Sequence, residues 1–308
     1  MQEESIFPAR PLAGLPALTQ SQPIMNNPLR PGIIGLGIIG QRVAASLRAK
    51  GIQPAVWNRT PHPDAPGWTP TLAALGSACD VFQIFVTDGP ALLGVIQELL
   101  PALGPGKIVL NCATVSLGDT HAAAELVTKT GAAFLDAPFT GSKNAAAEGQ
   151  LIYYVAGERA TLDSVRPLLE ASSKEILFAG AIGSATVLKI ATNMVSATIV
   201  GILSEAMGIV AAQGIPLAKF QLALENNAAS SGVSKLKIPS MIAADFSPHF
   251  SLKNMLKDAS FGLQLGAVSG LQLPILTTVA EGMAVMASNG HSDEDYSVMA
   301  ANYLPPKS

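Results

Sequence analysis

Short apolar runs alternate with longer segments of mixed polarity up to about residue 182 of this 308-residue chain. This alternation predicts strands that are each followed by a helix, and therefore a doubly wound, mainly parallel sheet. The predicted strands cover residues 32–34, 55–57, 81–86, 108–111, 133–136, 151–156 and 176–178. The predicted helices between them cover residues 41–50, 90–100, 119–130 and 160–171.

Beyond Gly183 the strand-like runs stop, and only helical segments follow. They cover residues 184–213, 217–226, 235–244, 254–266 and 275–288. The first of them, Ser184 to Gln213, is almost entirely apolar or small and contains no proline. It is too long for a strand, so it predicts a buried helix of roughly 45 Å at 1.5 Å per residue. We expect this helix to run between two domains.

Two polar residues interrupt the apolar surface of that helix. Lys189 and Asn193 are four positions apart, so they share one face. A lysine on a buried helix costs free energy to desolvate unless it meets a partner or a ligand. We therefore place the candidate chemistry on this face.

A glycine-rich turn, GLGIIG, lies between the first predicted strand and the first predicted helix. In this strand–turn–helix context GxGxxG is typical of dinucleotide binding, because its glycines permit a tight turn and let a pyrophosphate approach the helix N-terminus. The alternative is an ordinary glycine-rich turn. The candidate cofactor contacts are Gly35, Leu36, Gly37, Ile38, Ile39 and Gly40.

The second strand ends in Asn58, Arg59 and Thr60, and these three residues extend the candidate cofactor site. NAD-binding folds usually carry Asp or Glu here to hold the ribose hydroxyls. Asparagine followed by arginine favours NADP instead, because a guanidinium can bind a phosphate with two hydrogen bonds. The alternative is that Arg59 is a solvated loop residue.

Residues that follow other strands are candidates because ligands bind beyond the C-terminal ends of parallel strands. Thr114 follows one such strand. Thr140, Gly141 and Ser142 follow another, and their hydroxyl and N–H groups could bind a small carboxylate. The alternative is a plain turn. In the run from Phe250 to Asp258, Lys253 and Lys257 share a helical face, which by spacing alone indicates a solvated helix surface.

Composition narrows the function classes. The chain is 49% hydrophobic and only 13% charged, which favours a buried oligomer interface. A net charge of −3 gives no electrostatic reason for binding nucleic acid or an anionic membrane. Two cysteines and four scattered histidines predict neither a disulfide framework nor a metal site, which suits a reducing cytoplasm. The long apolar helix contains charged residues, so we do not interpret it as a membrane span.

The first 29 residues are rich in proline and poor in large apolar side chains, which predicts a disordered extension. No basic start followed by an apolar run indicates a signal peptide. An organelle-targeting peptide is an alternative that Glu3 and Glu4 disfavour.

Four segments in order resemble the β-hydroxyacid dehydrogenase family: GLGIIG at Gly35, DAPFTGS at Asp136, GSATVLKIATN at Gly183 and FSLKNMLKD at Phe250. The resemblance extends from Pro31 to about Tyr303. It is closest to the glyoxylate/succinic semialdehyde reductases. This chain has Thr140 where the family usually has serine, which adds a methyl group to a tight pocket. It has Ile39 in place of methionine, a swap that nearly conserves volume.

The resemblance implies an α/β Rossmann-type domain for NADP at residues 30–182 and an all-helical domain for substrate and dimerisation at residues 183–308. It implies that a long interdomain helix joins them. By the same resemblance Lys189 is the catalytic lysine, and Asn193 is its neighbour at the substrate. Thr114 and Lys257 would contact NADP. The substrate site would be lined by Thr140, Gly141, Phe250 and Asp258.

The sequence therefore predicts NADPH-dependent reduction of a small aldehyde acid, glyoxylate or succinic semialdehyde, with the proton from Lys189. Alternatives are another activity of the family, on 3-hydroxyisobutyrate or tartronate semialdehyde, an imine reductase, or a non-catalytic NADP-binding module. We expect a cytoplasmic homodimer or homotetramer that binds neither metal, nucleic acid nor membrane.

Overall fold

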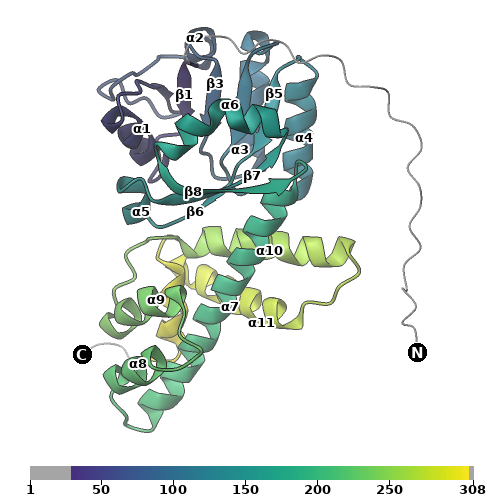
Figure 1. Cartoon of the computed structure of the whole chain (residues 1–308). Coiled ribbons are helices and arrows are strands. Elements are labelled where there is room, and N and C mark those ends of the chain that lie inside the picture. The colour runs from purple at the N-terminus through teal and green to yellow at the C-terminus, as the bar shows by residue number, and fades with distance from the viewer. Residues whose placement is uncertain (1–28, 305–308) are drawn as a thin grey trace, which may run out of the picture.

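The computed structural model describes residues 29–304 (Figure 1). All but the last residue of the predicted disordered extension, residues 1–29, lies outside this range. Figure 1 shows a sheet flanked by helices above a cluster of helices, with helix α7 passing from one to the other. This arrangement confirms the predicted fold class, an α/β doubly wound domain followed by an all-α domain on a long interdomain helix.

The sheet has the order β2-β1-β3-β4-β5-β7-β6, with β8 paired to β7. Strands β1 to β5 are parallel, whereas β7 runs antiparallel to β5 and β6. Every residue of β1, β3 and β4 is buried, because helices cover both faces of the sheet. The strands are β1 Pro31–Ile34, β2 Ala55–Trp57, β3 Val81–Ile84, β4 Ile108–Asn111, β5 Ala133–Asp136, β6 Phe139–Thr140, β7 Leu151–Gly157 and β8 Ser173–Gly180.

The helices of this domain are α1 Gly40–Ala49, α2 Leu72–Ala78, α3 Gly89–Leu99, α4 Leu117–Thr128, α5 Lys143–Ala147 and α6 Arg159–Glu170, with a short 3-10 turn η1 Leu100–Ala102. Helices α2 and α5 were not predicted, because both are short and their apolar periodicity is weak. Each of the two helices has a side-chain cap at its N-terminus. Thr71 accepts a hydrogen bond from the N–H of Ala74 in α2, and Ser142 accepts one from the N–H of Ala145 in α5.

Three predictions for the strands were wrong. β8 spans Ser173–Gly180 rather than residues 176–178. β3 ends at Ile84 rather than at residue 86, because Phe85 and Val86 leave the sheet. The stretch 137–143 is not only a turn: Phe139 and Thr140 form β6, which pairs with Tyr153 and Ile152 of β7. A two-residue strand has no periodicity, so only its partner reveals it.

The helical domain contains α7 Ser184–Ala212, α8 Leu217–Glu225, α9 Gly232–Ala243, α10 Leu252–Val268 and α11 Pro274–Met286, followed by η2 Ala287–His291 and η3 Tyr296–Asn302. Each predicted helix is present. α9 begins three residues earlier than predicted, because Ser231 and Ser234 form a reciprocal capping box.

Helix α7 packs on β7, β8, α9, α10 and α11. Its first turn is attached to the sheet by Asp136 at the end of β5, whose carboxylate accepts hydrogen bonds from the N–H and the hydroxyl of Thr186 at 2.8 Å each. The prediction of a buried helix holds for only part of α7, since one apolar face of the helix is exposed in the single chain. Length and composition alone would also suit a membrane span.

A buried ion pair holds the helical domain together, and the sequence did not predict it. Lys237 of α9 donates to both carboxylate oxygens of Asp295, at 2.7 and 2.8 Å, and both side chains are about 95% buried. The same carboxylate accepts the N–H groups of His249 and Phe250. It thereby fixes the segment that leads into α10.

We expect Lys237→Met to lower the free energy of unfolding by about 3–5 kcal/mol, because it leaves a buried carboxylate without its counter-ion. Urea denaturation followed by circular dichroism measures this. The control is Lys253→Met, which removes a lysine from an exposed ion pair with Asp293 and should cost less than about 1 kcal/mol. Equal effects of the two variants would contradict the role given to Lys237.

Candidate active site

The glycine-rich turn between β1 and α1 uses its three glycines for different reasons. Gly35 has φ +96°, and a Cβ there would lie 2.0 Å from the carbonyl oxygen of Phe85. A Cβ on Gly40 would lie 1.9 Å from the carbonyl oxygen of Gly35. Gly37 differs, because no atom lies within 4 Å of the place where its Cβ would be. The protein itself therefore does not require glycine at position 37, and the space above it is open.

The other residues of this turn divide between core and surface. Leu36 and Ile39 pack against the hydrophobic core, whereas the side chain of Ile38 is exposed. No side chain caps the N-terminus of α1, unlike those of α2, α3, α4 and α5. The N–H groups of Gln41 and Arg42 donate to the carbonyl oxygens of Gly37 and Ile39. Because no side chain occupies this end of the helix, an anion could approach it.

Asn58 at the end of β2 supports the turn. Its side-chain oxygen accepts the N–H of Leu36 at 2.9 Å, and its amide nitrogen donates to the carbonyl oxygen of Thr60 at 2.9 Å. Arg59 is exposed and has no hydrogen bond or ion pair within residues 29–304. The structure thus gives Asn58 a role in shaping the loop and leaves the guanidinium of Arg59 available.

A chain of polar contacts connects α7, α10 and the end of β4. Lys189 Nζ donates to Asn193 Oδ1 at 3.1 Å, and Asn193 Nδ2 donates to Asp258 Oδ2 at 2.6 Å. Asp258 is fully buried, and its other oxygen lies 3.0 Å from Lys257 Nζ. Lys257 in turn donates to the carbonyl oxygen of Thr114, just beyond β4. Five residues singled out from the sequence are therefore in one network that spans both domains.

Lys189 is half-buried in this network, and burial lowers the pKa of its ammonium group to about 8. The negative charge of Asp258 opposes this shift, and the positive charge of Lys257 adds to it. A lysine with such a pKa has substantial populations of both the ammonium and the amine near neutral pH. It can therefore give or take a proton at the face of α7.

The segment from Thr140 to Ser142 lies on the side of the sheet domain that faces the helical domain (Figure 1). Gly141 has φ +138°, a conformation that favours glycine. The hydroxyl of Ser142 is used inside the protein as the cap of α5. The hydroxyl of Thr140 has no hydrogen-bond partner among the described residues, so it is available to a ligand.

Phe250 is half-buried, and its ring packs edge-on against Tyr296 with centroids 6.3 Å apart. Its position depends on the Lys237–Asp295 pair, because Asp295 accepts the Phe250 N–H. Sequence reasoning missed this pair. The signal was nevertheless present, since Lys237 interrupts an apolar helix face as Lys189 does.

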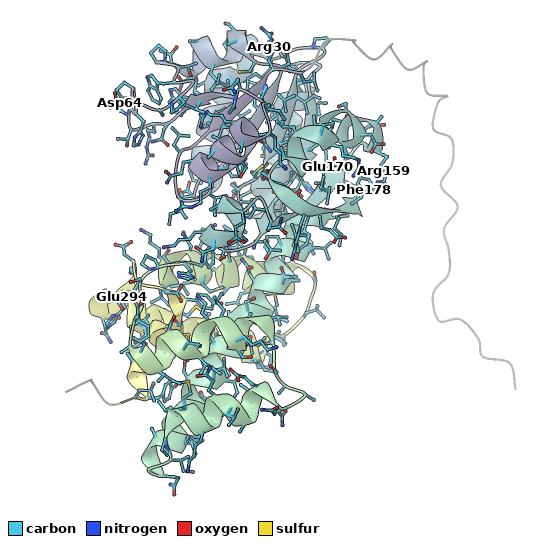
Figure 2. The ribbon with its side chains drawn as sticks, turned by 60° about the vertical axis from the view of Figure 1, so that its left-hand side comes forward. Arg30, Asp64, Arg159, Glu170, Phe178 and Glu294 are labelled. Carbon is cyan, nitrogen blue, oxygen red and sulfur yellow. The ribbon has the colours of Figure 1, made fainter. Side chains whose placement is uncertain are left out.

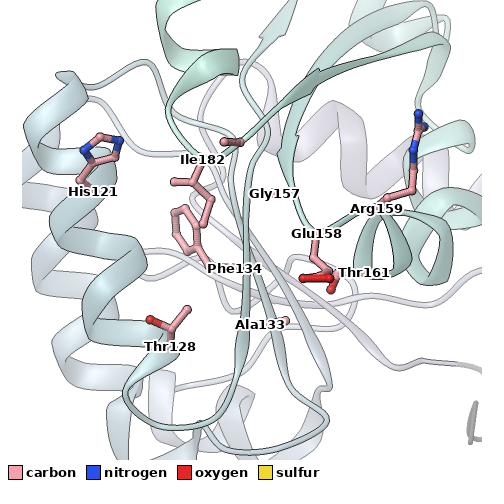
Figure 3. A pocket seen from close by; sticks show the side chains of 10 residues that line it. His121, Thr128, Ala133, Phe134, Gly157, Glu158, Arg159, Thr161 and Ile182 are labelled. Atoms are coloured by element: carbon pink, nitrogen blue, oxygen red, sulfur yellow. The ribbon is translucent and has the colours of Figure 1, made fainter. Parts of the chain in front are cut away.

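A cavity of about 620 Å³ in the sheet domain is lined by residues of α4, β5 and α6 (Figure 3). It is lined by His121, Phe134, Glu158, Arg159 and Ile182 among others, and by none of the predicted site residues. Close to it, the Arg159 guanidinium stacks 4.1 Å from the centre of the Phe178 ring, at the edge of the domain (Figure 2). The polar network, not this cavity, is the candidate active site.

Two family models match consecutive parts of the chain. Residues 30–180 match the family model described as the NAD binding domain of 6-phosphogluconate dehydrogenase. Residues 183–303 match the model described as NAD-binding of NADP-dependent 3-hydroxyisobutyrate dehydrogenase.

Individual proteins match over most of the chain. The 2-hydroxy-3-oxopropionate reductase of Escherichia coli is 30% identical over 87% of this chain and 94% of its own length. The chloroplastic glyoxylate/succinic semialdehyde reductase 2 of Arabidopsis thaliana is 28% identical over 87% and 77%, respectively. The solved 3-hydroxyisobutyrate dehydrogenase of Mycobacterium tuberculosis with L-serine superposes with a TM-score of 0.82 at 23% identity and covers 90% of this chain and 99% of its own.

The two family models follow one another along the chain in the order that the motifs predict. Together with the relative at 30% identity, they confirm the predicted family. The chain belongs to the β-hydroxyacid dehydrogenase family of NAD(P)-dependent oxidoreductases that act on CH–OH groups.

Proposed function

We propose that this protein uses NADPH to reduce a small aldehyde acid, glyoxylate or succinic semialdehyde, to the hydroxy acid. The observation that carries the proposal is the half-buried amine of Lys189, which is hydrogen-bonded to Asn193 and backed by the buried carboxylate of Asp258. The names of the Arabidopsis and Escherichia coli relatives support an aldehyde acid as the substrate class.

The residues of the turn fit a dinucleotide. The open space above Gly37 and the uncapped start of α1 suit a pyrophosphate, which would approach the backbone from Gly35 to Gly40. The unpaired guanidinium of Arg59, beside Thr60, suits the 2′-phosphate of NADP better than the bare ribose of NAD. Thr114 and Lys257 complete the proposed cofactor site. When bound, the nicotinamide cofactor supplies the hydride.

The side chains of the protein donate the proton and bind the substrate. Lys189, as the ammonium, donates its proton to the carbonyl oxygen while negative charge develops there. Asn193 holds the lysine in place through the 3.1 Å hydrogen bond. The free hydroxyl of Thr140 and the backbone at Gly141 and Ser142 bind the carboxylate of the substrate. Phe250 forms an apolar wall.

The alternatives differ in what they demand of Lys189. Activity on 3-hydroxyisobutyrate or tartronate semialdehyde would use the same groups and differ in the fit of the substrate. An imine reductase or a non-catalytic NADP-binding module would not need a lysine with a lowered pKa at this position. The observed network therefore favours an enzyme that moves a proton to or from oxygen.

We expect Gly37→Ala to weaken NADPH binding at least about tenfold without loss of stability, because the added methyl group meets no protein atom but would meet a pyrophosphate. Fluorescence titration with NADPH and thermal unfolding measure the two effects. Gly94→Ala is the matched control, since its Cβ also enters open space but on the surface of α3. Unchanged affinity in Gly37→Ala would contradict the proposed cofactor position.

We expect NADPH oxidation with glyoxylate or succinic semialdehyde, and a fall in kcat of about 10²–10⁴-fold in Lys189→Ala with cofactor binding retained. The assay is a steady-state panel of these two aldehydes with tartronate and methylmalonate semialdehydes, repeated with NADH. Near-full turnover by Lys189→Ala would rule out the assigned proton donor. Binding of NADPH without turnover of any aldehyde would favour the non-catalytic module.

The exposed face of α7 supports the proposal of a homodimer or homotetramer. Leu188, Val195, Ile202 and Ile209 recur every seven residues along α7, and all four side chains are exposed in the single chain. An apolar stripe at this spacing is what a second helix would cover. The buried, unpaired Cys79 and Cys112 suit the proposed cytoplasmic location.

Ile202→Lys should therefore convert the oligomer into monomers, because the charge would be desolvated at the centre of the stripe. Size-exclusion chromatography with light scattering measures the mass. Ala73→Lys, on the exposed side of α2 in the sheet domain, is the control and should leave the mass unchanged. A monomeric wild type would refute the proposed interface.

A further inference from the structure

The buried carboxylate of Asp258 is connected to two lysines, directly to Lys257 and through Asn193 to Lys189. Asp258 has no exposed surface. One of its oxygens accepts from Asn193, which in turn holds Lys189, and the other lies 3.0 Å from Lys257 Nζ. A substrate would not reach this carboxylate. The geometry therefore favours an action of Asp258 on Lys189 through Asn193, rather than the direct substrate contact that the sequence suggests.

The charged groups around Lys189 come mainly from α10, namely Asp258 and Lys257. From β5, Asp136 faces the first turn of α7 at Thr186, where its oxygens are occupied. From α4, His121 lies against Gly183 at the start of the helix. Asp258 and Lys257 are therefore the two groups whose charges act most directly on the Lys189 amine.

Lys257 is held next to Asp258 from both domains. It belongs to α10 of the helical domain, yet it donates to the carbonyl oxygen of Thr114 in the sheet domain. Lys257 Nζ also lies 5.1 Å from the centre of the Phe261 ring. These contacts keep a positive charge close to the carboxylate, so part of the negative charge of Asp258 is neutralised before it can act on Lys189.

We propose that Asp258 is a counter-ion shared between Lys257 and the Asn193–Lys189 pair, and that this sharing sets the pH at which Lys189 loses its proton. Asp258 and Lys257 are thus positioning residues that act on Lys189 in opposite directions. The consequence for turnover depends on the proposed function, because reduction needs Lys189 to carry the proton.

The titration of Lys189 can be measured on the protein without cofactor. Competitive labelling with acetic anhydride over a pH range, read by mass spectrometry of the peptide that contains Lys189, gives the midpoint of the amine. In the wild type we expect it near pH 8. Asp258→Asn removes the negative charge and should lower the midpoint by about one pH unit, whereas Lys257→Met removes the positive charge and should raise it by about one.

Matched controls carry the same charge changes on the exposed part of the same surface. Lys253→Met removes a lysine one turn earlier in α10, and Asp293→Asn removes its exposed partner. Solvent screens these charges, so neither should move the midpoint by more than about 0.3 unit. Circular dichroism verifies that each variant is folded.

A downward shift in Asp258→Asn together with an upward shift in Lys257→Met supports the shared counter-ion, and the reverse pair of shifts overturns it. Unchanged midpoints, or shifts in the same direction, overturn it. If Asp258→Asn fails to fold, Lys257→Met decides alone, because only an upward shift agrees with the proposal.

The pH profile of kcat separates this inference from the proposed function. Reduction by the wild type should slow as the pH rises through about 8, because the ammonium form is lost, and the variants should shift this decline in step with the labelling midpoint. If labelling shifts but the kcat profile does not, the shared counter-ion stands and Lys189 is not the proton donor.

Discussion

The hydrogen bonds between Asp136 and Thr186 join the last parallel strand of the sheet to the first turn of α7. Burial raises the pKa of the Asp136 carboxyl, and the N–H and hydroxyl of Thr186 oppose that shift by stabilising the charged form. Because the helix is rigid, fixing Thr186 also fixes Lys189 about one turn later. The position of the candidate chemistry thus depends on a carboxylate far from it in the sequence.

Lys237 and Lys189 of the helical domain show how its surroundings decide whether a lysine stabilises the fold or can exchange a proton. Lys237 is 4% exposed and is held by both oxygens of Asp295. Lys189 is only partly buried, and the neutral side chain of Asn193 lies between it and the carboxylate of Asp258. A directly paired, dry ammonium stabilises the fold, whereas an indirectly paired one at a surface can exchange a proton.

Helix α7 is apolar on two faces, one of which is packed inside the chain while the other is exposed to solvent. One face packs on the sheet and on α9, α10 and α11, and the opposite face carries the exposed stripe from Leu188 to Ile209. Desolvating such a stripe is favourable at about 25 cal/mol per Å². The same helix therefore positions Lys189 and leaves an apolar stripe exposed, which supports the proposed oligomer.

The sequence by itself determined what depends on neighbours along the chain. The alternation of strands and helices, the glycine-rich turn and the shared face of Lys189 and Asn193 follow from periods of two and 3.6 residues and from a short motif. The order of four motifs was enough to identify the family. Short elements such as β6 and α5 have no period, so the sequence could not reveal them.

Tertiary structure alone decided which polar side chains are buried and which partners they meet there. The spacing of Lys257 in the sequence indicates a solvated helix residue. In the structure it lies between Asp258 and the carbonyl group of Thr114, which is 143 positions from Lys257 in the sequence. Asn58 supports the loop that it was expected to line, and Lys237 meets Asp295 across 58 positions. Burial and charge pairing depend on the packing of remote elements, and spacing along the chain carries no information about that packing.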